Sequence, residues 1–87
     1  MKDPDSASDT VLSDTLLTQL RASMKSRKAE EVVHLHIPQT PQARSQVRDL
    51  FNADRWHLAT CSWGSEYRET FTKSRSGKNA RVVVVYG

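Results

Sequence analysis

The last third of the chain, residues 55–87, constrains the fold more than any other stretch. Alternating and β-branched residues, interrupted by two short polar segments, predict three consecutive strands. The tight turn Gly64-Ser65 separates the first two, and the polar segment SRSGKN supplies a second hairpin tip. The last strand, ARVVVVY, is apolar on both faces, which is typical of a strand in the interior of a sheet. The three strands are predicted at 56–63, 67–73 and 80–86.

A fourth strand is predicted upstream, at EVVHLHI, residues 31–37, which is rich in β-branched residues and stops at Pro38. Placing this first strand beside the valine-rich last strand gives the spatial order 2-3-4-1, with the last strand between two neighbours. The competing order 1-2-3-4 exposes the edge of a long apolar strand, which is an aggregation hazard. Dimer formation across that edge would also protect it.

Two amphipathic helices complete the prediction. Leucines at 12, 16 and 20 and Met24 recur every four residues, which predicts a helix at roughly 9–28, capped by Ser8 or Asp9. The pair Thr40-Pro41 is typical of a helix start, and the apolar stripe that follows predicts a second helix ending near 52–54.

These elements predict one small α+β domain at 9–87, preceded by a disordered acidic leader at 1–8. The element order is α-β-α-β-β-β, with a mostly antiparallel four-stranded sheet packed with two helices. One helix covers one face of the sheet, and the second helix or a second subunit covers the other. A homodimer is a further prediction, because a domain of 87 residues buries a modest core.

The net charge of +3 is distributed unevenly along the chain. Residues 21–87 carry twelve Lys or Arg against six Asp or Glu, whereas residues 1–20 carry one Lys against four Asp. A basic body behind an acidic leader predicts a polyanionic partner. The alternative is a solvated surface that happens to be basic.

Several function classes are disfavoured by the sequence. The single Cys61 rules out an internal disulfide and suits a reducing cytoplasm, and no apolar run approaches the ~20 residues of a membrane helix. We therefore expect a soluble cytoplasmic protein without a membrane partner. The chain has no glycine-rich phosphate loop. His57 lies roughly 13 Å along its strand from Cys61, which is too far for it to activate the thiol as a nucleophile. We expect Cys61 to be buried and structural. We expect no catalytic activity.

Zinc ligand types occur at four positions, His34, His36, His57 and Cys61. The predicted strand order puts the first two at the opposite edge of the sheet from the last two, roughly 14 Å away. We therefore expect no metal site and no cofactor.

The most informative constellation interleaves aromatic and basic side chains on the predicted C-terminal hairpins. Nucleic-acid-binding sheets combine cations for phosphates with exposed rings for stacking on bases. We expect Tyr67 and Phe71 to face a helix, and Trp63 to lie on the opposite, partner-facing side with Arg68. The candidate nucleic-acid contacts are Trp63, Arg68, Lys73, Arg75, Lys78 and Arg81.

From Thr40 onward, the order of helix, Trp-initiated strand, Gly-Ser turn, basic strand and valine-rich strand resembles a known topology. It is the helix-plus-three-strand core of double-stranded RNA-binding domains and of the small HicA-type messenger-RNA interferases. Those interferases use a histidine just after the Gly-Ser turn for catalysis. Glu66 and Tyr67 stand there in this chain, so the resemblance does not imply cleavage.

The sequence thus predicts a non-catalytic regulatory module that binds nucleic acid. The alternative is a small inhibitor or adaptor of the phage or mobile-element type, which binds a host protein through the Trp63 face or a strand edge. A structural subunit that assembles through the edge of Val82–Val85 is the third class.

Overall fold

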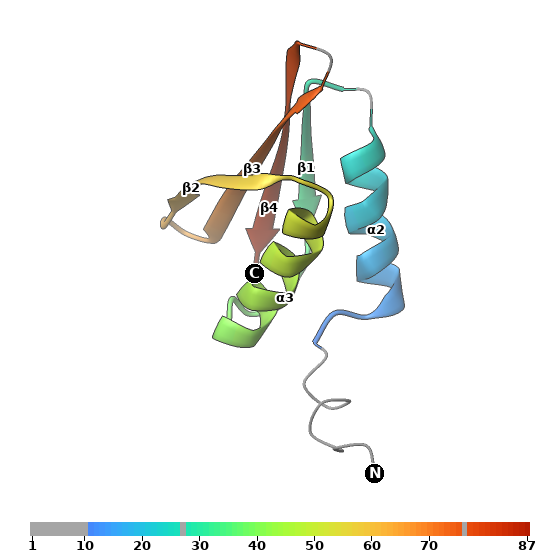
Figure 1. Cartoon of the computed structure of the whole chain (residues 1–87). Helices are drawn as coiled ribbons and strands as arrows, with labels where there is room; N and C mark the ends of the chain where they lie inside the picture. The colour runs from blue at the N-terminus through green and yellow to red at the C-terminus, as the bar shows by residue number, and fades with distance from the viewer. Residues whose placement is uncertain (1–10, 27, 76) are drawn as a thin grey trace.

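A computed structural model describes residues 11–26, 28–75 and 77–87, which form two helices and four strands (Figure 1). The predicted leader at 1–8 lies outside the described residues. Within them, no helix has the length and apolar composition needed to cross a membrane. In chain order the elements are α2 (Asp14–Lys25), β1 (Glu30–His34), α3 (Pro41–Ala53), β2 (His57–Ser62), β3 (Tyr67–Arg75) and β4 (Lys78–Tyr86).

The four strands form one sheet in the order β1-β4-β3-β2, which is the predicted order. Strand β1 runs parallel to β4, and the other neighbouring pairs are antiparallel. Val82 pairs with Glu31 on one side and with Phe71 on the other, so both edges of β4 are hydrogen-bonded within the chain. The hypothesis of a subunit that assembles through the edge of Val82–Val85 is therefore wrong.

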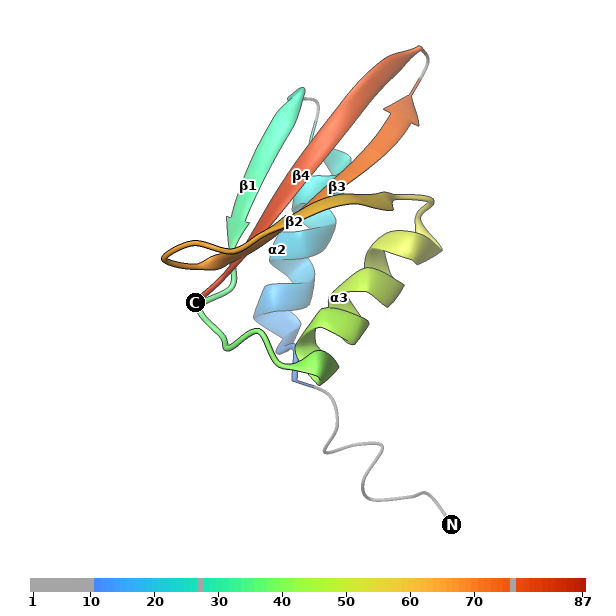
Figure 2. The same cartoon turned by 90° about the vertical axis from the view of Figure 1, so that its left-hand side faces the viewer.

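Both helices pack on the same face of the sheet, as the two views show (Figures 1 and 2). Their apolar stripes meet the strands in one core, where the rings of Phe51 and Phe71 stack with centroids 4.2 Å apart. The rings of Trp56 and Phe51 meet at a T-shaped angle, with centroids 5.8 Å apart. The opposite face, called the open face below, has no helix over it in the described part of the chain. The valine-rich strand is therefore interior but is not covered on both faces, and Val83 remains half-exposed.

The second helix begins as predicted, because Thr40 Oγ1 accepts a hydrogen bond from the amide of Ala43 at 3.1 Å. The helix ends at Ala53, and Arg55 rather than Asn52 takes the left-handed conformation after it, with φ of 66°. The first helix is shorter than the predicted 9–28. Its N-cap is Ser13, whose hydroxyl accepts from the amide of Leu16 at 3.2 Å.

Strand β2 contains an irregularity that changes which of its side chains share a face. The register with β3 shifts between Leu58 and Thr60, so Cys61 lies opposite Glu69 on the helix side and Ser62 lies opposite Arg68 on the open face. Regular alternation along residues 57–61 would instead put Cys61 on the same face as His57. Cys61 is also exposed, so the prediction of a buried cysteine is wrong.

Candidate nucleic-acid interface

The predicted phosphate-binding residues lie on both faces of the sheet rather than on one surface. By the alternation of side chains along β3 and β4, Arg68 and Arg81 are on the open face. Lys73 and Lys78 take helix-side positions near the tip of the β3–β4 hairpin. The side chain of Arg75 lies outside the described structure. The five residues therefore do not form one continuous basic patch.

Ion pairs reduce the positive charge that the open face offers. Arg68 lies 3.6 Å from Glu66, and Arg81 lies 3.3 Å from Glu30. All four side chains are at least one-third exposed, and exposed pairs of this kind contribute about 0–1 kcal/mol. Such pairs are weak enough that a phosphate can replace the carboxylate.

Lys73 is held more firmly. Its ammonium lies 3.4 Å from Asp54 and 5.9 Å from the ring centroid of Trp56, and its side chain is only 21% exposed. The stem covers a buried ring while the charge is paired, so this lysine connects β3 to the end of α3. It therefore has less side chain available for a ligand than Arg68 or Arg81.

Trp63 is the most exposed Trp, Tyr or Phe side chain of the described residues, with 68% of its surface accessible. Its ring packs at a tilt against buried Tyr67, with centroids 4.5 Å apart. The register shift in β2 accounts for this position. Before the shift the odd-numbered side chains of β2 point to the open face, and after it they point to the helix side. The prediction that Trp63 lies with Arg68 on the face opposite Tyr67 is therefore wrong in its geometry.

A hollow of about 350 Å³ adjoins this ring. It lies between the β2–β3 turn and the chain that leaves β1, and we call it the Trp63 hollow. Its volume is at the small end of the range for ligand sites. The lining residues are Pro38, Gln39, Trp63, Gly64, Ser65, Glu66, Tyr67, Tyr86 and Gly87.

Arg44 adds a cation beside the same aromatic pair. The guanidinium carbon of Arg44 lies 5.7 Å from the ring centroid of Tyr67, within cation–π range. Its Nε is buried and has no hydrogen-bond partner among the described residues. Arg44 and Arg48, one helical turn apart, also line a shallow hollow on α3 with Pro41, Ser45, Asp49 and Asn52.

The buried carboxylate of Glu69 holds Tyr67 in place through a hydrogen bond. Glu69 is fully buried, and its Oε2 accepts hydrogen bonds from Arg48 Nε at 3.0 Å, Arg48 Nη2 at 2.8 Å and the Tyr67 hydroxyl at 3.0 Å. Its Oε1 accepts from the Tyr86 hydroxyl at 2.9 Å. Four donors therefore satisfy a charge that would otherwise be costly in the core.

This network shifts the ionisation of its members. Burial, with contributions from the Cys61 thiol and the Glu69 charge, raises the pKa of Tyr67 to about 12. Burial and the Glu69 charge also raise the pKa of Tyr86. The hydrogen bonds to Glu69 raise the pKa of Arg48 above its usual value. The tyrosines therefore stay neutral donors and the arginine stays charged at neutral pH.

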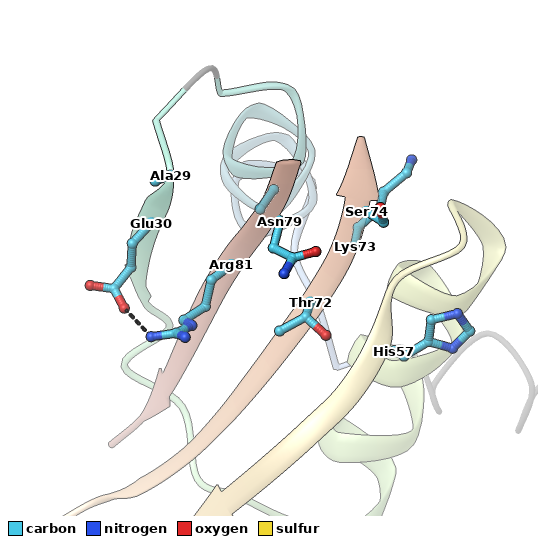
Figure 3. A pocket seen from close by; sticks show the side chains of 9 residues that line it. Ala29, Glu30, His57, Thr72, Lys73, Ser74, Asn79 and Arg81 are labelled. Atoms are coloured by element: carbon cyan, nitrogen blue, oxygen red, sulfur yellow. Dashed lines mark hydrogen bonds and ion pairs between the residues drawn. The ribbon is translucent and has the colours of Figure 1, made fainter. Parts of the chain in front are cut away.

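A larger hollow of about 590 Å³ lies on the open face near the β3–β4 hairpin tip, and we call it the sheet hollow (Figure 3). Four strands contribute one polar side chain each to a row across it, since Glu30 pairs with Arg81, Arg81 with Thr72, and Thr72 with His57. Asn79 extends the row toward the tip. Figure 3 shows these side chains, with the ion pair between Glu30 and Arg81 dashed. The hollow offers both donors and acceptors but no Phe, Tyr or Trp ring.

The histidines and the cysteine are divided as predicted, with His34 on the β1 edge and His57 and Cys61 on the β2 edge. His36 follows β1, and its ring stacks on His34 at 6.0 Å. In the described ranges, no group of three or more His, Cys, Asp or Glu side chains has an arrangement suited to a metal ion.

Sequence reasoning missed the roles of Arg44, Arg48 and Glu69. A signal was present in Glu69, because it alternates with Tyr67 and Phe71 on the side of β3 predicted to face a helix. An acidic residue on such a face needs a buried partner. No protein-family model, curated protein or solved structure matches this chain.

Proposed function

We propose that this protein is a non-catalytic module that binds single-stranded nucleic acid, with Trp63 as a stacking platform for an unpaired base. The observation that carries the proposal is the exposed Trp63 ring, held against Tyr67 beside a hollow, with Arg44 over the Tyr67 ring. Aromatic side chains in such positions stack on bases and contribute about 1–3 kcal/mol per base. The bases of a duplex are already stacked on one another, so the platform favours single strands.

The surrounding cations supply the phosphate contacts in this proposal. Arg68 is on the strand that follows the Trp63 turn and is paired only weakly, and Arg44 contacts the Tyr67 ring from α3. Arg81 on the open face and Lys78 on the helix side add separate positive charges nearer the hairpin tip. The sequence-based list is therefore kept, but its centre moves from the β3–β4 hairpin tip to the β2–β3 turn, with Trp63 on the helix side and Arg68 on the open face.

The test is binding of labelled single-stranded RNA and DNA by fluorescence anisotropy. Trp63→Ala should weaken binding by about 5- to 150-fold, which is the loss of one stacked base. Arg68→Ala should weaken binding across unrelated sequences and reduce the slope of log affinity against log salt by about 0.7. Arg21→Ala, which removes the same charge from the exposed side of α2, is the matched control and should change neither quantity. Equal binding by Trp63→Ala and the unaltered protein would overturn the proposal.

A second candidate function rests on the composition of the Trp63 hollow. Pro38, Tyr67 and Tyr86 join Trp63 there, and tryptophan and tyrosine are frequent anchors of protein interfaces. An inhibitor or adaptor would use the hollow for an apolar side chain of a partner protein. This function predicts that Trp63→Ala abolishes a protein complex recovered from the native host, while nucleic-acid binding is weak and independent of Trp63.

A further inference from the structure

The outer edge of β1 is unpaired in the described part of the chain, and it lies at the side of the sheet away from β2 (Figure 1). The amide of Leu35 donates to Val85 O, and the amide of Arg81 donates to Ala29 O, each at 2.9 Å. Odd-numbered residues of this segment therefore direct their backbone groups to β4. Glu30, Val32 and His34 direct their N–H and C=O groups outward.

Two further features of this edge indicate that it takes a partner strand. Val32 is 51% exposed, and it is one of two large hydrophobic side chains that are exposed among the described residues, with Trp63. A groove of about 330 Å³ follows the edge between α2 and β1. Its lining contains no Lys, Arg, Asp or Glu, in keeping with the depletion of charge at interface cores. The lining residues are Gln19, Ala22, Ser23, Val32, Val33 and His34.

We propose that a second copy of this chain occupies this edge, with the two β1 strands antiparallel about a two-fold axis at Val32. The axis places Val32 opposite Val32 of the second copy and Glu30 opposite His34 of the second copy. Every outward-facing residue of β1 then falls in a hydrogen-bonded pair, which gives about six backbone hydrogen bonds. The result is a continuous eight-stranded sheet with all helices on one side.

The polar residues of β1 favour a second copy and this register. Glu30 begins the strand and His34 ends it, so antiparallel self-pairing at Val32 places the Glu30 carboxylate of each copy opposite an imidazole that can donate a hydrogen bond to it. An axis at Glu31 would instead place two glutamates directly opposite each other, which is destabilising. The other free edge, on β2, carries a register shift that disfavours strand pairing.

The proposal is independent of nucleic-acid binding and is tested by light scattering of the whole protein over a wide concentration range. The unaltered chain should change from its monomer mass of 9.9 kDa to twice that mass as concentration rises. Val32→Pro removes an outward N–H without removing a hydrogen bond to β4, so it should weaken self-association at least about tenfold. Val32→Thr keeps the backbone donor and should still dimerise.

Circular dichroism of Val32→Pro provides the folding control, since its spectrum should match that of the unaltered chain. A monomer at every concentration would overturn the proposal, and so would a dimer that the folded Val32→Pro variant forms with unchanged affinity. If Val32→Pro unfolds, Val32→Lys provides the second test, because it should abolish the dimer by placing two like charges at the two-fold axis. A dimer of Val32→Lys with unchanged affinity would likewise overturn the proposal.

Discussion

Replacing Glu69 tests whether its buried hydrogen bonds to Arg48, Tyr67 and Tyr86 stabilise the fold and hold Tyr67 against Trp63. In Glu69→Gln the amide oxygen can take the place of Oε2 toward Arg48 and Tyr67, and the amide nitrogen can donate to the Tyr86 hydroxyl, which rotates to accept. The hydrogen bonds are kept, but each loses the charge that strengthens it. Arg48 is 38% exposed and is partly resolvated by water. We expect a loss of about 2 kcal/mol in the free energy of unfolding.

Glu69→Leu should cost more, about 4 kcal/mol, because it leaves the hydroxyls of Tyr67 and Tyr86 buried without an acceptor at about 1–3 kcal/mol each. It also deprives Arg48 of its counterion. Adding Tyr67→Phe and Tyr86→Phe to this variant removes the orphaned hydroxyls. The triple variant should therefore be more stable than Glu69→Leu alone, which is a non-additive result.

Urea denaturation followed by tryptophan fluorescence measures these differences, since Trp56 is 1% exposed in the folded protein. The midpoint should fall while the dependence on urea stays constant. A loss below about 1 kcal/mol for Glu69→Leu, or no recovery in the triple variant, would refute the reasoning.

Three further predictions concern ionisation and local structure. Because the folded protein keeps tyrosine protons that the unfolded chain releases, its stability should fall as the pH rises from about 10 through about 12, and ultraviolet absorbance should show delayed ionisation of both tyrosines. Ionisation near pH 10 in the folded state would contradict this. Thr40→Ala removes the cap of α3 and should cost about 1 kcal/mol in thermal or urea unfolding. Gly77→Ala should cost about 1–2 kcal/mol because φ is +80°, although no heavy atom crowds the new Cβ; an unchanged stability would show that the turn relaxes.

Much of the fold could be predicted because local patterns and one global constraint agree. The stripe of α3 and its Thr40-Pro41 start are local signals, and the structure confirms both. The strand order followed from the need of an apolar strand, Val82–Val85, for two neighbours, and it is also confirmed. The start of α2 was predicted less well, because several Ser and Asp residues near it are equally good caps.

The candidate site was less predictable because it depends on contacts between distant elements. The register shift in β2 leaves no clear mark in the sequence around Ala59, yet it decides which side Trp63 and Cys61 occupy. The pairing of Lys73 with Asp54 likewise depends on how the end of α3 meets β3. Alternation along a strand predicts faces correctly only while the register is regular.

The measurement that tests the central claim most directly is tryptophan fluorescence during titration with a short single-stranded RNA. The chain has two tryptophans, of which Trp56 is buried and Trp63 is exposed. Stacking of a base on Trp63 should quench the emission of the unaltered protein and leave that of Trp63→Phe, which reports Trp56 alone, nearly constant. Unchanged emission of the unaltered protein at RNA concentrations that saturate binding, or equal quenching in both proteins, would contradict a stacking role for Trp63.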